Sequence, residues 1–159
     1  MNLSDDLRPL LNKAFFYLKF RPRTKKETEN YLLKKIKTTH WSTDDVIKII
    51  TYLEEIELID DKKFTVWFIE QRNILKPKSQ FLLTKELLQH GVDKDLIDAY
   101  FSNNSLNEEE LAFQTLKSRW NRYKNLDKRK QFEKAISFLL RRGFSYEISR
   151  QTVKKLEEI

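Results

Sequence analysis

Residues 132–145 read FEKAISFLLRRGFS, and this stretch decides the fold. Its apolar residues recur at the i, i+3, i+4, i+7, i+8 spacing of one helical face: Phe132, Ala135, Ile136, Leu139 and Leu140. Gly143 follows this stripe at the C′ position, where glycine adopts a positive φ without strain. Ser145 is a natural N-cap for another helix. The stretch therefore predicts a helix, a glycine turn and the start of a second helix.

Two earlier stretches of the chain follow the same plan. Basic residues flank a proline at 21–23 (RPR) and at 76–78 (KPK), and residues 128–130 (KRK) hold the corresponding place before the third stretch. A leucine pair comes ten residues after the centre of each triplet: Leu32-Leu33, Leu87-Leu88 and Leu139-Leu140. Self-similarity at a fixed period indicates tandem repeats. The sequence predicts an all-α fold, an elongated, curved array of three tandem three-helix repeats at 1–57, 58–104 and 105–159.

The opening helices of the three repeats are expected at roughly 7–20, 61–75 and 107–124. Ser42 and Asp93 correspond to Ser145 as N-caps of the closing helices. Residues 64–69 (FTVWFI) have the composition of a strand. The repeat pattern and the Asp60-Asp61 start signal nevertheless favour a helix there.

The composition limits the class of protein. Only two glycines and three prolines occur among 159 residues, which argues against an all-β fold. The chain has no cysteine, so disulfides and thiolate metal sites are excluded. Its start lacks the basic and apolar regions of a signal peptide, and no apolar run approaches the roughly 20 residues that span a bilayer. We therefore expect a cytoplasmic protein without membrane contact.

No pattern of catalytic residues is present. The two glycines are 52 residues apart, so there is no glycine-rich phosphate loop. His40 and His90 are the only histidines, and neither has a second ligand at metal spacing. Acidic pairs lie at predicted helix starts, where capping explains them. We expect no enzymatic activity, no cofactor and no small-molecule substrate.

The net charge of +7 suggests an acidic partner, either nucleic acid or an acidic protein surface. Seven basic residues and one acid lie between Lys117 and Lys130, interleaved with Trp120 and Tyr123. Any single lysine there can be explained as part of a solvated helix face, but clusters at equivalent places in three repeats suggest a row of positive charge. The aromatic residues could stack on bases, although their helical spacing is more typical of core packing.

Four segments together resemble the RecX family of bacterial regulatory proteins. They are RPRT (21–24), LEEIELIDDKKFTVWFIEQR (53–72), KPKSQFLLTKELLQHGVD (76–93) and LLRRGFSYEI (139–148). Their order and spacing agree with the family, and the resemblance extends from about residue 14 to 156. It implies a protein of three-helix repeats that binds the RecA–DNA filament in its groove, and a monomer would suit such groove binding. It also implies inhibition of the recombinase, ATPase and coprotease activities of RecA, and so a role in DNA repair and the SOS response.

On this hypothesis, eleven basic residues contact the filament by charge and hydrogen bonding. They are Arg21, Arg23, Lys25 and Lys26 in the first repeat, Arg72, Lys76 and Lys78 in the second, and Arg119, Arg122, Arg141 and Arg142 in the third. Two alternatives remain open: direct binding of single- or double-stranded DNA that affects recombination by competition, and an adaptor protein whose charge is incidental.

Overall fold

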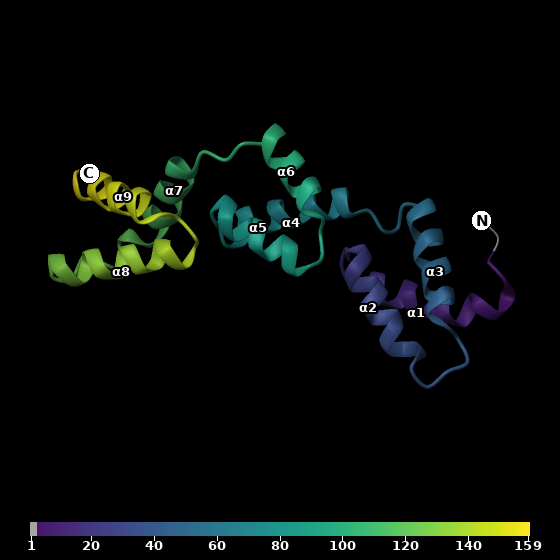
Figure 1. The fold of residues 1–159 in the computed structure, drawn as a ribbon. Helices are drawn as coiled ribbons and strands as arrows, with labels where there is room; N and C mark the ends of the chain where they lie inside the picture. The colour runs from purple at the N-terminus through teal and green to yellow at the C-terminus, as the bar shows by residue number, and fades with distance from the viewer. Residues whose placement is uncertain (1–2) are drawn as a thin grey trace. The chain divides into compact units, whose positions relative to one another are not determined.

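The computed structural model describes residues 3–159, which form α-helices and a short 3₁₀ helix (Asp5–Leu7) and contain no strand (Figure 1). The helices are α1 (Arg8–Leu18), α2 (Lys25–Ile36), α3 (Thr43–Glu55), α4 (Asp61–Leu75), α5 (Gln80–Gln89), α6 (Lys94–Asn103), α7 (Glu108–Trp120), α8 (Lys128–Arg141) and α9 (Tyr146–Glu157). The all-α prediction is therefore confirmed. Residues 1 and 2 lie outside the described residues. They belong to the first predicted repeat and to the start of the chain, where no signal peptide is expected.

The ambiguous segment at 64–69 is helical. It lies within α4, whose start is capped by Asp60: its Oδ1 accepts hydrogen bonds from the amides of Lys62 (2.9 Å) and Lys63 (3.0 Å). Four buried residues of this helix follow a helical spacing, namely Phe64, Thr65, Phe68 and Ile69. Burial of one helical face therefore prevails over the β propensity of the individual residues.

The predicted ends of two opening helices are wrong by a few residues. Helix α1 ends at Leu18 and not at Phe20, and α7 ends at Trp120 and not at Lys124. After α7 the amides of Arg122 and Tyr123 bond to carbonyls three residues back, so the chain turns toward α8. Such tightening at a helix end leaves little trace in a hydrophobic pattern.

The predicted caps and turns are confirmed. Ser42 Oγ accepts from the Asp45 amide (3.3 Å), and Ser145 Oγ accepts from the Ile148 amide (3.2 Å). Asp93 Oδ1 accepts from the Asp95 amide at 2.8 Å. Gly91 and Gly143 have φ angles of +82° and +86°, the left-handed conformation expected for a glycine after a helix.

The chain divides into two compact units. The first contains the residues up to Trp67 together with Leu87–Ile97, and the second contains Phe68–Glu86 and Asp98–Ile159. Helices α4, α5 and α6 each begin in one unit and end in the other. The three repeat boundaries and the curvature of the array therefore stay predictions. The all-α organisation itself is what the described residues show.

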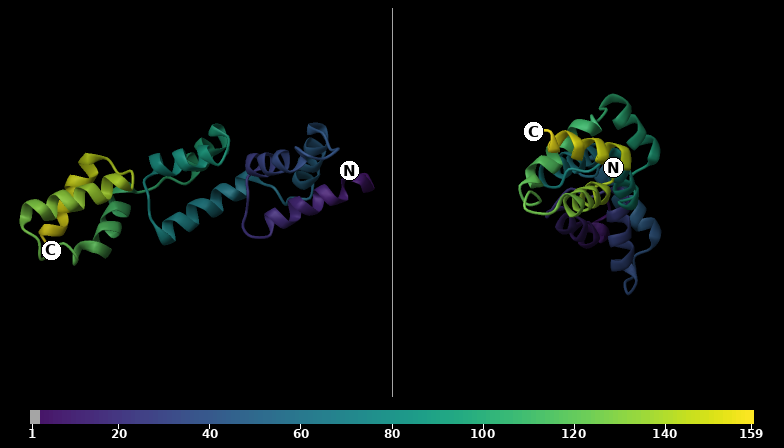
Figure 2. Two further views of the ribbon diagram at one scale, coloured as in Figure 1. Left: turned by 90° about the horizontal axis from the view of Figure 1, so that it is seen from below. Right: turned by 90° about the vertical axis from the view of Figure 1, so that its left-hand side faces the viewer.

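Each unit has its own hydrophobic core. The first core includes Leu10, Leu32, Ile49 and Leu53, and the second includes Ala112, Leu116, Ala135, Leu139 and Val153. In the second unit α9 packs on both α7 and α8, and Figure 2 shows these three helices side by side. No helix among residues 3–159 is both long enough and apolar enough to cross a membrane.

The leucine pairs have one buried and one more exposed member. Leu32, Leu87 and Leu139 are each 0% exposed, whereas Leu88 and Leu140 are each 44% exposed. The first leucine of each pair is therefore a core residue in all three repeats.

This difference predicts unequal costs for two adjacent substitutions in α8. Leu139→Ala should lower the free energy of unfolding by about 2–5 kcal/mol, because it leaves a cavity in the second core. Leu140→Ala removes the same atoms from a half-exposed position and should cost less than about 1 kcal/mol. Urea denaturation of both variants measures the difference, and equal losses would contradict the assigned register of the helix.

Candidate functional site

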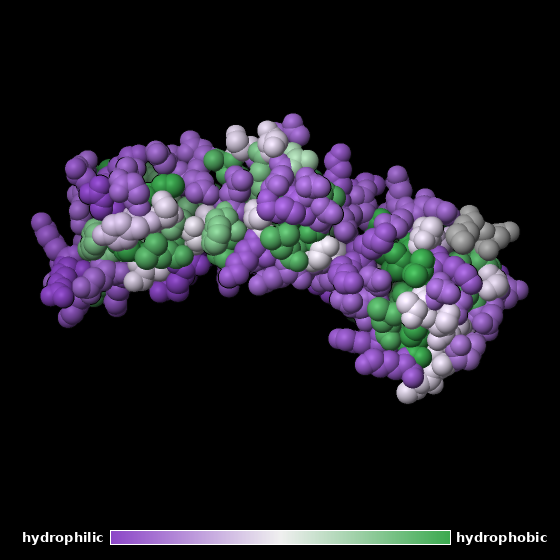
Figure 3. All heavy atoms as spheres, in the orientation of Figure 1, coloured by the Kyte–Doolittle hydropathy of each residue, from purple (hydrophilic) through white to green (hydrophobic). Residues whose placement is uncertain are grey.

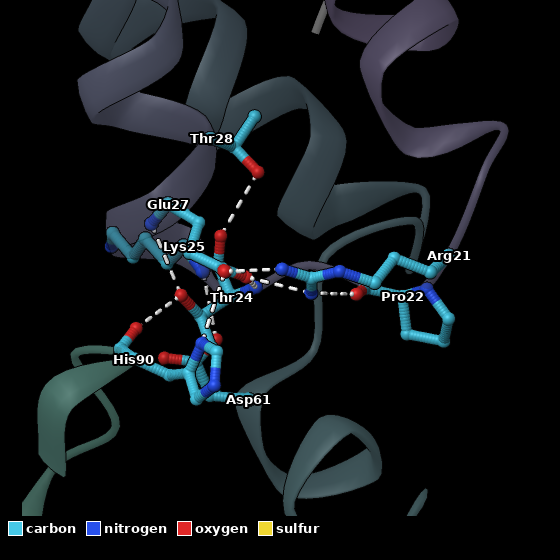
Figure 4. A network of polar contacts seen from close by, with 8 residues as sticks. All are labelled: Arg21, Pro22, Thr24, Lys25, Glu27, Thr28, Asp61 and His90. Atoms are coloured by element: carbon cyan, nitrogen blue, oxygen red, sulfur yellow. Dashed lines mark hydrogen bonds and ion pairs between the residues drawn. The ribbon is translucent and has the colours of Figure 1, made fainter. Parts of the chain in front are cut away.

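The first basic–proline–basic segment leads into the capped start of α2 (Figure 4). Thr24 Oγ1 accepts from the Glu27 amide (3.0 Å), and Glu27 Oε2 accepts from the Thr24 amide (3.1 Å). This is a capping box, which satisfies two otherwise unpaired donors of the first helical turn. Pro22, two residues before the cap, fits a turn that fixes the entry of the chain into the helix.

The same cap binds a turn that lies 66 residues further along the chain. Thr24 Oγ1 donates to the His90 carbonyl at 2.6 Å, and the Thr24 residue is 0% exposed. Gly91 follows directly, and a Cβ on it would lie 2.4 Å from Cβ of Lys26. Both the positive φ and this close approach require glycine at position 91. The glycine turn after α5 thus packs on the first turn of α2.

A carboxylate at the centre of this junction neutralises its positive charge. Glu27 accepts from Arg21 Nη2 at 2.7 Å and from Nη1 at 3.2 Å, and His90 Nδ1 lies 3.0 Å from Glu27 Oε1. Burial raises the pKa of Glu27, but hydrogen bonds from Arg21, the Thr24 amide and His90 outweigh it, so this pKa lies below its ordinary value. Glu27 is therefore ionised in the folded chain at neutral pH.

Acidic side chains of α3 and α4 also contact the first junction. The Lys25 amide donates to Asp61 Oδ1 at 2.8 Å, and Lys25 Nζ lies 3.0 Å from Glu54 Oε2. Burial raises the pKa of Asp61, and the nearby charges of Glu54 and Asp60 raise it further against the opposing effect of Lys25. Acidic residues thus face the basic segment from several elements.

The second junction repeats this arrangement within the second unit. The Ser79 amide donates to the Arg142 carbonyl at 2.9 Å, and Ser79 Oγ accepts from the Leu82 amide at 3.2 Å. Gly143 follows Arg142, and a Cβ on it would lie 2.4 Å from Ser79 Oγ and 2.7 Å from Cβ of Leu82. The turn after α8 therefore packs on the start of α5, as the turn after α5 packs on the start of α2.

A carboxylate again neutralises the basic residues of the second junction. Glu86 accepts from Arg72 Nε at 3.1 Å, and its other oxygen is paired with Lys78. The Arg72 guanidinium also lies over the Phe68 ring, 4.9 Å from its centroid. Lys76, by contrast, is exposed and forms no ion pair with any acid of residues 3–159.

The third basic triplet has only local partners. Asp127 caps α8 by accepting from the Lys130 amide at 3.0 Å, and its carboxylate lies 3.5 Å from Lys130 Nζ. Arg129 pairs with Glu133, one helical turn ahead, at 3.0 Å. These exposed pairs contribute little to stability.

The predicted contact residues therefore fall into two groups. Residues of the first group form ion pairs with acidic side chains. The pairs are Arg21–Glu27, Lys25–Glu54, Lys26–Glu29, Arg72–Glu86 and Lys78–Glu86. Arg23 pairs with no acid among residues 3–159: its guanidinium lies 4.2 Å from the Tyr17 ring centroid, and its buried Nε has no hydrogen-bond partner. The second group has no acidic partner in the described part of the chain: Lys76, Arg119, Arg122, Arg141 and Arg142.

Four of these unpaired residues lie at or just after the ends of α7 and α8, and we call them the arginine cluster: Arg119, Arg122, Arg141 and Arg142. The guanidinium carbons of Arg119 and Arg142 lie 4.8 and 5.1 Å from the centroid of the Phe138 ring. Burial lowers the pKa of Arg142, and the charges of Arg119 and Arg141 lower it further. An anion bound here would relieve that repulsion.

The acidic partners of the basic segments were not predicted from the sequence. The Thr24 and Glu27 spacing of a capping box was a usable local signal. The pairing of Glu27 with His90 and of Glu86 with Arg72 gave no such signal, because these partners are 63 and 14 residues apart.

The helices and junctions define a class of protein, an all-α repeat protein with an unpaired cluster of arginines. A family model described as "RecX, third three-helix domain" matches residues 107–153. The regulatory protein RecX of Prosthecochloris aestuarii is 30% identical over 153 residues, which is 95% of this chain and 95% of that protein. The chain therefore belongs to the RecX family of regulatory proteins.

Further relatives agree with this assignment. The regulatory proteins RecX of Finegoldia magna and Streptococcus mutans are 28% and 30% identical, and the chain spans only 65% and 55% of their lengths. The crystal structure of RecX from Lactobacillus salivarius superposes with a TM-score of 0.76 at 25% identity, covering 99% of this chain and 100% of that one. A second crystal structure of regulatory protein RecX, at 21% identity and a TM-score of 0.72, shares the fold.

The ion-pair network around Glu27 predicts a pH-dependent contribution to stability. Glu27→Gln should lower the free energy of unfolding by about 1–3 kcal/mol at pH 7, because charged hydrogen bonds are lost. Since folding lowers the pKa of Glu27, its contribution is present above the ordinary value of 4.5 and is lost as the pH falls through the folded value. The difference from the wild type should therefore shrink between pH 7 and pH 3 in urea denaturation.

Glu29→Gln is the matched control, because Glu29 forms only a surface pair with Lys26 at 3.2 Å. It should cost less than about 1 kcal/mol at either pH. A Glu27→Gln loss that is the same at pH 7 and pH 3 would contradict the ionised network.

Proposed function

We propose that this chain binds the RecA–DNA filament and inhibits the recombinase, ATPase and coprotease activities of RecA, thereby modulating DNA repair and the SOS response in the cytoplasm. Membership of a family of regulatory proteins supports a regulatory role. The observation that carries the proposal is the arginine cluster, whose charge is not neutralised within residues 3–159. A protein filament assembled on DNA is a partner with a high density of negative charge.

Exposed apolar residues next to the free Lys76 support a protein partner as well. Ile74, Leu75 and Phe81 are 75%, 71% and 72% exposed, and all belong to the second unit. Figure 3 shows apolar side chains at the surface among hydrophilic ones. Large exposed apolar side chains beside unpaired cations are typical of protein-binding surfaces. We therefore assign filament contact to the second unit, and a structural role to Arg21, whose guanidinium is held by Glu27.

Inhibition of the DNA-dependent ATPase of RecA tests this proposal. The wild-type chain should inhibit at equimolar or lower amounts. Arg122→Glu with Arg141→Glu should raise the half-inhibiting concentration by about tenfold or more, because two exposed and unpaired charges are reversed. Absence of inhibition by the wild type would contradict the function, and full inhibition by the double variant would contradict only the site.

The control is Arg129→Glu with Arg150→Glu, which changes the net charge equally. Both arginines are exposed and already paired, with Glu133 and Glu147 at 3.0 and 3.1 Å. This variant should change the half-inhibiting concentration less than about twofold. Equal effects of the two double variants would indicate attraction by net charge alone. If bare DNA binds the chain as tightly as the filament does, direct competition for DNA replaces filament binding as the mechanism.

A further inference from the structure

A cavity of about 530 Å³ lies in the second unit, apart from the residues of the arginine cluster. Side chains from the end of α7, the start of α8 and the end of α9 line it, together with the turn after α7: Lys117, Trp120, Lys124, Lys128, Gln131 and Glu157 are among them. Since residues three or four apart share a helical face, Lys117 and Trp120 point to one side of α7 while Arg119 points to another. Neither the family relationship nor the proposed function accounts for this cavity.

The charge around the cavity is unbalanced. Lys117, Lys124 and Lys128 are all exposed, and none is ion-paired with an acid within residues 3–159. The Nζ of Lys117 lies 5.8 Å from the centroid of the Phe113 ring. Glu157 is the one acidic side chain among the lining residues, beside the three lysine side chains. A bound anion would compensate the excess positive charge.

The remaining lining groups indicate what the anion carries. Trp120 is 8% exposed, so most of its ring is core while the rest forms part of the cavity wall. Gln131 offers an amide that both donates and accepts hydrogen bonds. The volume falls in the range of about 300–1,000 Å³ that is usual for small-molecule sites. The lysine ammonium groups can bind a phosphate, and the Trp120 ring and the Gln131 amide can contact a base. This combination suits a nucleotide.

We propose that this cavity binds a nucleoside phosphate, with the phosphate held by Lys117, Lys124 and Lys128. The ligand is either a free nucleotide or one nucleotide of a single strand, since both present the same phosphate, sugar and base. Glu157 opposes binding by repelling the phosphate. The proposal is independent of filament binding, because it rests on the lysine-lined cavity and not on the arginine cluster.

Calorimetric titration of the full chain with ADP tests the proposal without RecA. We expect saturable one-site binding that weakens at least tenfold in Lys124→Glu with Lys128→Glu. Glu157→Gln should instead tighten binding, because it removes the opposing charge, and a purely structural role of Glu157 would not have this effect. Lys134→Glu is the control, since Lys134 is exposed in α8 and does not line this cavity. It should leave the affinity within about twofold of the wild type.

The position of the ligand can be read from tryptophan fluorescence. Trp41→Phe with Trp67→Phe leaves Trp120 as the only tryptophan, and its emission should change with the same saturation curve. A dT oligonucleotide that displaces ADP identifies a strand nucleotide as a source, and failure to displace it identifies free nucleotide only. Absence of saturable binding, or equal weakening by the Lys134 and lysine-pair variants, would overturn the proposal.

Discussion

The junction between a glycine turn and the capped start of a helix is the constraint on which the structure depends. In the turn after α5, the His90 carbonyl accepts a hydrogen bond from the Thr24 hydroxyl. In the turn after α8, the Arg142 carbonyl accepts one from the Ser79 amide. The capping residue of each contact, Thr24 or Ser79, is 0% exposed. A side chain on either glycine would overlap the helix start that the turn contacts. Glycine, the preceding carbonyl and the hydroxyl cap are therefore needed together, twice in one chain.

This constraint explains the basic–proline–basic segments that stand out in the sequence. Each segment is followed by the threonine or serine of a junction, and one of its charges, Arg21 or Lys78, pairs with a carboxylate of the helix that follows. Glu27 holds Arg21 and His90 in the first case, and Glu86 holds Arg72 and Lys78 in the second. Breaking one partner of such a partly buried pair leaves the other charge uncompensated. One charge of each segment thus stabilises the chain, and the unpaired arginines of α7 and α8 provide the charge that we propose for binding.

Much of the fold could be predicted from the sequence because its signals are local. The apolar stripe of α8, the caps at Ser42 and Ser145 and the positive φ of Gly143 each depend on neighbouring residues. The helical state of residues 64–69 required the repeat pattern to outweigh local propensity. The candidate site could be predicted only in part. Whether a given arginine is free depends on which carboxylate folding brings near it, and Glu27 and His90 are 63 residues apart.

The basic residues fall into ion-paired ones with a structural role and unpaired ones proposed to bind the filament. Hydrogen–deuterium exchange of the chain on RecA–DNA filaments tests this division most directly. We expect slower exchange at 117–124 and 139–143, where the unpaired arginines lie. Exchange at 21–27 should stay as it is in the free chain, because the hydrogen bonds of that junction are already formed. Protection of 21–27 by the filament, with no change at the ends of α7 and α8, would contradict filament binding through the unpaired arginines.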